Sequence, residues 1–127
     1  MKGFLANIEE KTLVNTFFRQ VIYTGQHAQL VLMCLRPNEE IGMEVHETVD
    51  QFFRIEQGEG KVIIEGEERS IKDGDAIIIP AGTNHNIVNT SSDKQLKFYT
   101  IYSPPHHKDG IIHKTKKAAE ADTTDHL

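Results

Sequence analysis

The chain has 127 residues, of which 38% are hydrophobic and 26% are charged, a composition typical of soluble globular proteins. A chain of this length predicts one domain with a hydrophobic core of its own. The formal net charge of −5 argues against non-specific binding to nucleic acid, and no nucleic-acid partner is expected.

The N-terminal segment and the cysteine content favour a cytoplasmic protein. Residues 1–13 lack the apolar core of a secretory signal, and no apolar stretch approaches the ~20 residues of a membrane helix, so no membrane partner is expected. The single cysteine, Cys34, has no partner for an internal disulfide. Its position in the apolar run Leu30–Leu35 predicts a buried, inert thiol.

Short segments rich in Ile, Val, Phe, Thr and Tyr follow one another along the chain, separated by Gly, Pro and polar turns. This pattern predicts an all-β sandwich or closed jelly roll, and residues 14–102 sustain no helical period. The predicted strands are Thr16–Thr24, Ala28–Arg36, Gln51–Gln57, Gly60–Glu65, Ala76–Ile79, His85–Thr90 and Leu96–Tyr102.

The character of the chain changes after Ser103-Pro104-Pro105. We expect a barrel with its N-terminal strands over residues 1–105. Residues 106–127 are expected to form a polar C-terminal tail that packs on the barrel or on a partner subunit, with a brief helix at Lys116–Ala121. The tail histidines His106, His107 and His113 are considered as a second metal site, against which stands the solvent exposure that is usual for adjacent histidines after prolines.

Four polar side chains are candidate metal ligands. Residues two apart on a strand share a face, so Glu44 and His46 would enter the barrel together. Gln51 opens the next strand, and His85 follows a Pro-Gly corner from a distant one. Each residue alone has an ordinary interpretation as a surface or turn residue. Together they predict that a closed β scaffold gathers Glu44, His46, Gln51 and His85.

Two imidazoles, one carboxylate and one amide oxygen make a ligand set without thiolate. Such a set suits one divalent ion, namely Zn, Mn, Fe, Co or Ni. The carboxylate of Glu44 cancels only one of the two charges of the ion. The site would therefore stay positive and polarise a bound water or a substrate oxygen.

Residues 42–58 and 74–89 resemble the first and second motifs of the cupin superfamily. The second motif matches at every fixed position, which are Gly74, Pro80, Gly82, His85 and Asn89. The first motif retains His46 but departs twice: Glu44 stands where the family usually has histidine, and Gln51 where it usually has glutamate. The resemblance implies a small single-domain cupin with a jelly-roll barrel, the double-stranded β-helix, that holds one metal.

The resemblance further implies an enzyme similar to phosphomannose-isomerase or uronate cupins, with a small sugar or sugar acid as substrate and isomerisation or ring opening as the reaction. Glu44, Tyr99 and Tyr102 are the candidate proton-transfer residues. An iron-dependent dioxygenase is an alternative, because Glu44, His46 and His85 have the composition of a two-His-one-carboxylate site. A non-catalytic small-ligand-binding module is a third possibility, favoured by the lack of a spare acid on the last strand.

The apolar run Leu30–Leu35 is hydrophobic on both faces. A barrel wall buries only one face, so we expect a homodimer packed sheet on sheet. On this hypothesis Leu32→Asp or Met33→Asp would disrupt folding or dimerisation.

Overall fold

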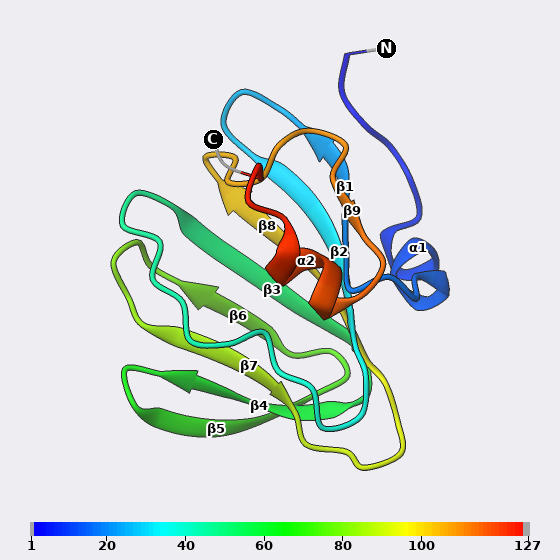
Figure 1. The fold of residues 1–127 in the computed structure, drawn as a ribbon, viewed down its shortest axis with the longest axis vertical. Coiled ribbons are helices and arrows are strands. Elements are labelled where there is room, and N and C mark those ends of the chain that lie inside the picture. Colours follow the sequence, from blue (N-terminus) through cyan, green and yellow to red (C-terminus); the bar gives the residue numbers. More distant parts are fainter. Residues whose placement is uncertain (1, 126–127) are drawn as a thin grey trace.

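The computed structural model describes residues 2–125 (Figure 1). Two short helices lie near the ends of this range, α1 (Ile8–Val14) and α2 (Lys116–Ala121). The strands are β1 (Arg19–Thr24), β2 (Gln29–Leu35), β3 (Asp50–Gln57), β4 (Glu59–Ile64), β5 (Glu67–Lys72), β6 (Ala76–Ile79), β7 (His85–Asn89), β8 (Leu96–Ser103) and β9 (Ile112–His113).

The strands form two antiparallel sheets that pack against each other (Figure 1). The larger sheet has the order β6-β3-β8-β2-β1-β9, and the smaller has the order β5-β4-β7. The core between them includes Phe53 and Phe98 from the larger sheet and Val62 and Ile87 from the smaller, all at most 3% exposed. This arrangement confirms the all-β jelly roll.

Side chains of β8 alternate between the interior and the outer face of the larger sheet. Phe98, Thr100 and Tyr102 are buried inside, whereas Tyr99 and Ile101 lie on the outer face. The alternation follows from the pleat of a strand, in which successive side chains point to opposite sides. Tyr99 and Tyr102 therefore have different surroundings although both lie on the last long strand.

Helix α1 was not among the elements predicted from sequence. Its N-cap is Asn7, whose side chain accepts a hydrogen bond from the backbone N–H of Glu10. The helix is close to β8 and β3, and Lys97 Nζ donates to the carbonyl oxygen of Leu13 at its C-terminal end. The helix has only 7 residues, too few for a helical period to be recognised in the sequence. Its local signals are a capping asparagine and a first turn rich in glutamate.

Both faces of β2 are covered largely by the same chain. Met33 is fully buried in the core, and Leu32, on the other face, is 2% exposed beside Val14 and Phe17. Cys34 is likewise buried, as predicted, and burial raises the pKa of its thiol. The two-sided hydrophobicity of Leu30–Leu35 thus has an explanation within one chain and does not by itself require a second subunit.

The C-terminal segment lies on the barrel. Strand β9 pairs with β1, where Arg19 opposes His113, and the Gln29 side chain of β2 binds the backbone of His106 and His107. Helix α2 has the predicted bounds and is capped by the side chain of Thr115. Among the described residues no helix has both the length and the apolar character needed to cross a bilayer.

Candidate metal centre

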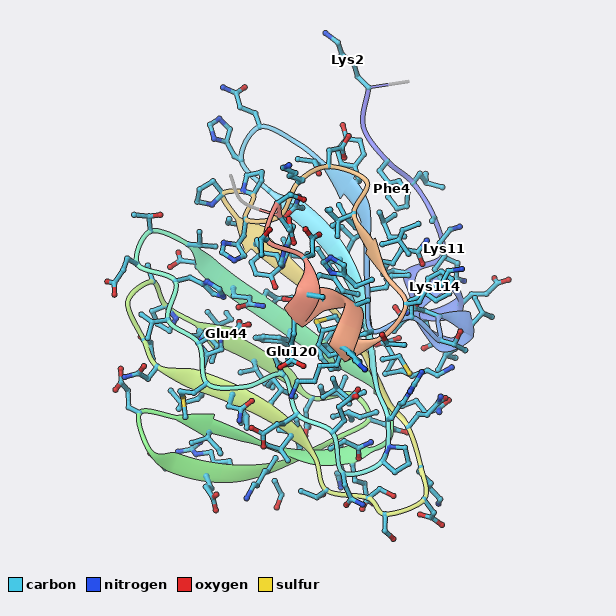
Figure 2. All side chains as sticks on the ribbon, viewed as in Figure 1. Lys2, Phe4, Lys11, Glu44, Lys114 and Glu120 are labelled. Carbon is cyan, nitrogen blue, oxygen red and sulfur yellow. The ribbon has the colours of Figure 1, made fainter. Side chains whose placement is uncertain are left out.

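Backbone hydrogen bonds fix two candidate ligands opposite each other. Glu44, on the long connection between β2 and β3 (Figure 2), forms an isolated bridge with His85 at the start of β7. Each residue donates its N–H to the carbonyl of the other, at 2.9 and 3.0 Å. The corner at Gly82 has a φ of +79°, a conformation that favours glycine, and its N–H donates to the His46 carbonyl at 2.8 Å.

These backbone contacts bring three side chains together as the Glu–His–His cluster, defined as Glu44, His46 and His85. One ligand atom from each residue lies within 4.8 Å of the other two. The Oε2 atom of Glu44 is 3.0 Å from His46 Nε2 and 4.0 Å from His85 Nε2. His85 is 2% exposed, whereas the side chains of His46 and Glu44 are 8% and 29% exposed, so the cluster is buried at His85 and open to solvent at Glu44.

Gln51 reaches the same point from the opposite sheet. Its Nε2 donates to Thr100 Oγ1 at 2.9 Å, which turns its Oε1 towards His85 Nε2 at 3.2 Å. The Nδ1 atom of His85 lies 2.9 Å from the Thr83 carbonyl and can bind it only by donating a proton. In the neutral ring Nε2 then carries a lone pair, so two acceptors, His85 Nε2 and Gln51 Oε1, face each other.

Facing acceptors fit a cation between them. Ligand atoms about 2.0–2.2 Å from a common metal lie roughly 3–3.5 Å apart, close to the spacing seen here. Hydrogen bonds from the outer ring nitrogen of His85 and the amide of Gln51 would hold both ligands in orientation. The site can hold a divalent metal, and the identity of that metal is not specified by this ligand set.

The charge of Glu44 is favoured by its neighbours. Burial raises the pKa of its carboxyl, but the hydrogen bond with His46 and the nearby charges of His46, Arg19 and His85 outweigh burial and lower it. Glu44 is therefore ionised near neutral pH, as a metal ligand must be.

The two tyrosines considered for proton transfer differ in position. Tyr102 is 2% exposed, and its ring lies 5.8 Å from that of His46. Burial, followed by the charge of Glu44, raises the pKa of Tyr102 far above its usual range, so it stays a neutral donor. Tyr99 lies on the outer face of the larger sheet against Phe52, and the sheet separates it from the cluster.

The tail histidines are not exposed, contrary to the expectation from sequence. His106 stacks on Tyr102 with ring centroids 5.3 Å apart, and its centroid is 4.2 Å from that of His46. Burial, followed by the charge of His46, lowers the pKa of His106. His107 and His113 are each 5% exposed and bind Asp125 and Asp122, respectively.

These three histidines do not gather into a second metal site. Within residues 2–125, the group of His, Cys, Asp and Glu side chains close enough to hold a metal is the Glu–His–His cluster. The position of His106 beside this cluster could not be predicted from sequence spacing, because this position depends on how the chain turns after β8. A wide, open surface hollow between the turns after β3 and β7 contains none of the candidate ligands.

A small two-sheet barrel with imidazole and carboxylate ligands gathered between its sheets is the architecture of a cupin. The family described as "Cupin domain" matches residues 31–102, and the chain belongs to it. The resemblance seen in the two sequence motifs is thus confirmed at the level of the family and the fold.

Among curated proteins, the chain is 45% identical to the uncharacterized protein YrkC of Bacillus subtilis, over 94% of this chain and 67% of that one. Among solved structures it is similar to BH2720 of Bacillus halodurans, with a TM-score of 0.92 and 42% identity over 95% of this chain and 96% of that chain. A predicted oxalate decarboxylase of Thermotoga maritima has a TM-score of 0.59 and 28% identity, covering 63% and 69% of the two chains.

Proposed function

We propose that this cupin is a metal-dependent enzyme that acts on a small sugar or sugar acid by isomerisation or ring opening. The observation that carries the proposal is the convergence of acceptor atoms from Glu44, His85 and Gln51 at one point between the two sheets. Acceptors so arranged repel one another unless a cation lies among them.

Glu44, His46, His85 and Gln51 would hold the ion. A divalent metal bound there supplies a positive charge that polarises a carbonyl or hydroxyl oxygen of the substrate. The amide of Gln51 contributes no charge, so the site with one carboxylate remains positive.

His106 supplies a proton acceptor beside the cluster. It can serve as the general base, a role for which the strand Leu96–Ser103 offers no carboxylate. Among residues 2–125 its ring nitrogens form no hydrogen bond, whereas both ring nitrogens of His107 are bonded. In an isomerisation, His106 would take a proton from the carbon next to the substrate carbonyl and return it to the neighbouring carbon. The electrons of the C–H bond shift through an enediolate, the hydroxyl proton of the first carbon passes to the former carbonyl oxygen, and no co-reactant is consumed.

The experiment combines metal analysis with an activity panel. Protein purified without chelators is expected to contain about one equivalent of a divalent metal. On a panel of aldoses, ketoses, sugar phosphates and uronates, we expect turnover that stops on removal of the metal and returns on its addition. A metal-free protein that binds a sugar but converts no compound of the panel would contradict the enzyme and support a binding module.

The composition of the Glu–His–His cluster also favours a second candidate, an iron-dependent dioxygenase. Two histidines and one carboxylate can hold iron and leave positions open for substrate and oxygen. Oxygen consumption by the Fe(II)-loaded protein in the presence of a substrate would support this reading. Substrate conversion under strict anaerobiosis would support the isomerase.

We further propose that the protein is a homodimer that pairs through the outer face of its larger sheet. An apolar row crosses this face from Ile78 on β6 through Phe52, Ile101 and Leu30, which oppose one another in register. Ile78 is 68% exposed, unlike Leu32 on the same face. A contiguous apolar row of this kind is a common site of subunit contact.

A further inference from the structure

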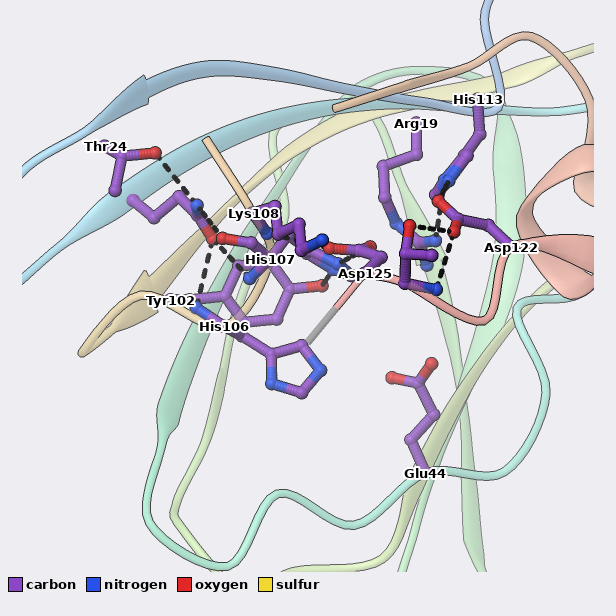
Figure 3. Close-up of polar contacts among 12 residues, drawn as sticks. Arg19, Thr24, Glu44, Tyr102, His106, His107, Lys108, His113, Asp122 and Asp125 are labelled. Carbon is purple, nitrogen blue, oxygen red and sulfur yellow. Dashed lines mark hydrogen bonds and ion pairs between the residues drawn. The ribbon is translucent and has the colours of Figure 1, made fainter. Parts of the chain in front are cut away.

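Arg19 is a buried cation at the edge of the candidate site. It begins β1, is 8% exposed and stacks over the Phe18 ring with its Cζ atom 5.2 Å from the ring centroid. Figure 3 shows Arg19 and Glu44 in the same region as Tyr102 and His106, and the charge of Arg19 is among those that lower the pKa of the Glu44 carboxyl.

The tail orients this guanidinium through a chain of hydrogen bonds. Arg19 Nη1 lies 3.3 Å from His113 Nδ1, and because arginine can only donate, Nδ1 is the acceptor. The proton of the His113 ring is then on Nε2, which donates to Asp122 Oδ2 at 2.9 Å. Asp122 thus fixes the imidazole, and the imidazole fixes one edge of the guanidinium.

Arg19 has no carboxylate partner in the part of the chain that the structure describes. Its Nε is buried and without a hydrogen-bond partner in these residues. The nearby acids are engaged elsewhere: Glu44 with His46, Asp122 with His113, and Asp125 with His107 and the backbone N–H of Lys108. A buried cation is costly unless an anion or acceptor satisfies it.

A substrate group can supply that acceptor. We propose that Arg19 binds the carboxylate of an acidic substrate whose other end reaches the Glu–His–His cluster. This inference rests on the proposed function and narrows its substrate class from sugars and sugar acids in general to compounds bearing a carboxylate. The planar guanidinium matches a carboxylate, and a hydroxyl or carbonyl group would leave its charge uncompensated.

The test compares acids with matched neutral compounds by calorimetric titration of the metal-loaded protein. The pairs are D-galacturonate with D-galactose, lactate with propane-1,2-diol, and malonate with malondiamide. For at least one pair we expect the wild type to bind the acid about tenfold or more tightly than its neutral partner. Arg19→Gln should abolish this preference and retain its metal. Arg54→Gln, on the outer face of β3, should keep the preference.

Two results would overturn the inference: no acid preferred by the wild type, or an unchanged preference in Arg19→Gln. If Arg19→Gln does not fold, Arg19→Lys replaces it. Lysine has no donor at the position of Nε, so the acid should bind at least about threefold more weakly, and unchanged binding would overturn the inference.

The outcome is separable from that of the proposed function. Metal content and turnover test the Glu–His–His cluster, whereas the acid preference tests Arg19. An Arg19-dependent acid preference in a protein that binds no metal would refute the enzyme and leave the carboxylate site standing. A metal-dependent activity without acid preference would support the enzyme and refute the carboxylate site at Arg19.

Discussion

The imidazole of His106 lies with its ring centroid 4.2 Å from that of His46, although the two residues come from segments far apart in the sequence. His46 belongs to the connection before β3, and His106 follows β8. Their contact places a side chain of the tail against the candidate metal centre. The tail is therefore part of the site, and not only a cover for the barrel.

The first prediction concerns the base. His106→Gln removes the imidazole and leaves the stacking surface of Tyr102 and the Glu–His–His cluster in place. We expect the turnover number to fall about 100-fold or more, since general-base catalysis contributes that much, with metal content unchanged. Steady-state kinetics with elemental analysis measures both. An equal loss in His27→Gln, a variant of an exposed histidine in the β1–β2 turn, would show that the effect is not specific.

The second prediction concerns metal retention. The double variant His46→Ala, His85→Ala removes both imidazoles from the cluster, and we expect it to lose bound metal after purification. Elemental analysis measures the loss, and circular dichroism checks that the barrel is folded. His27→Ala is the matched control and should keep its metal. Full metal retention by the double variant would refute the site.

The third prediction concerns Gln51, which is 2% exposed. Gln51→Glu adds a second carboxylate to the site, so metal affinity in a chelator competition should rise about tenfold. In the metal-free protein the same carboxylate would be buried near Glu44, and the melting temperature should fall below that of the wild type. We therefore expect a higher metal affinity together with a lower melting temperature of the metal-free protein. A lower affinity would show that Gln51 does not face the metal.

The fourth prediction concerns acid stability. The hydrogen bond from His113, followed by those from Thr124, lowers the pKa of Asp122 in the folded state below its value in the unfolded chain. The stabilisation is therefore present above about pH 4 and is lost as the pH falls towards the folded pKa. Urea unfolding should show Asp122→Asn less stable than the wild type at pH 7, with the difference shrinking below pH 4. A difference that is constant down to pH 2 would contradict this linkage.

The fifth prediction concerns the proposed dimer. Ile78→Asp places a charge in the apolar row on the outer face, where Ile78 is 68% exposed. We expect sedimentation to show a dimer for the wild type and a monomer for the variant, with little change in melting temperature. Leu32→Asp would be less informative, because Leu32 is buried beside Val14 and its substitution should unfold the chain. A variant that remains dimeric would refute this interface.

The barrel could be predicted from the sequence alone, because alternating apolar residues indicate strands and the Gly and Pro residues indicate the turns between them. It also singled out Glu44, His46, Gln51 and His85 through the spacing of the two motifs. The expectation that Glu44 and His46 share a strand was wrong, because both lie on the connection before β3, where Glu44 forms only an isolated bridge with His85. Only the tertiary structure decided which residues join them: Tyr99 faces outward, while Arg19 and His106 face the site. The physical reason is that these positions depend on the path of the tail over β1 and on cross-strand register. Such long-range contacts leave no periodic signal in the chain.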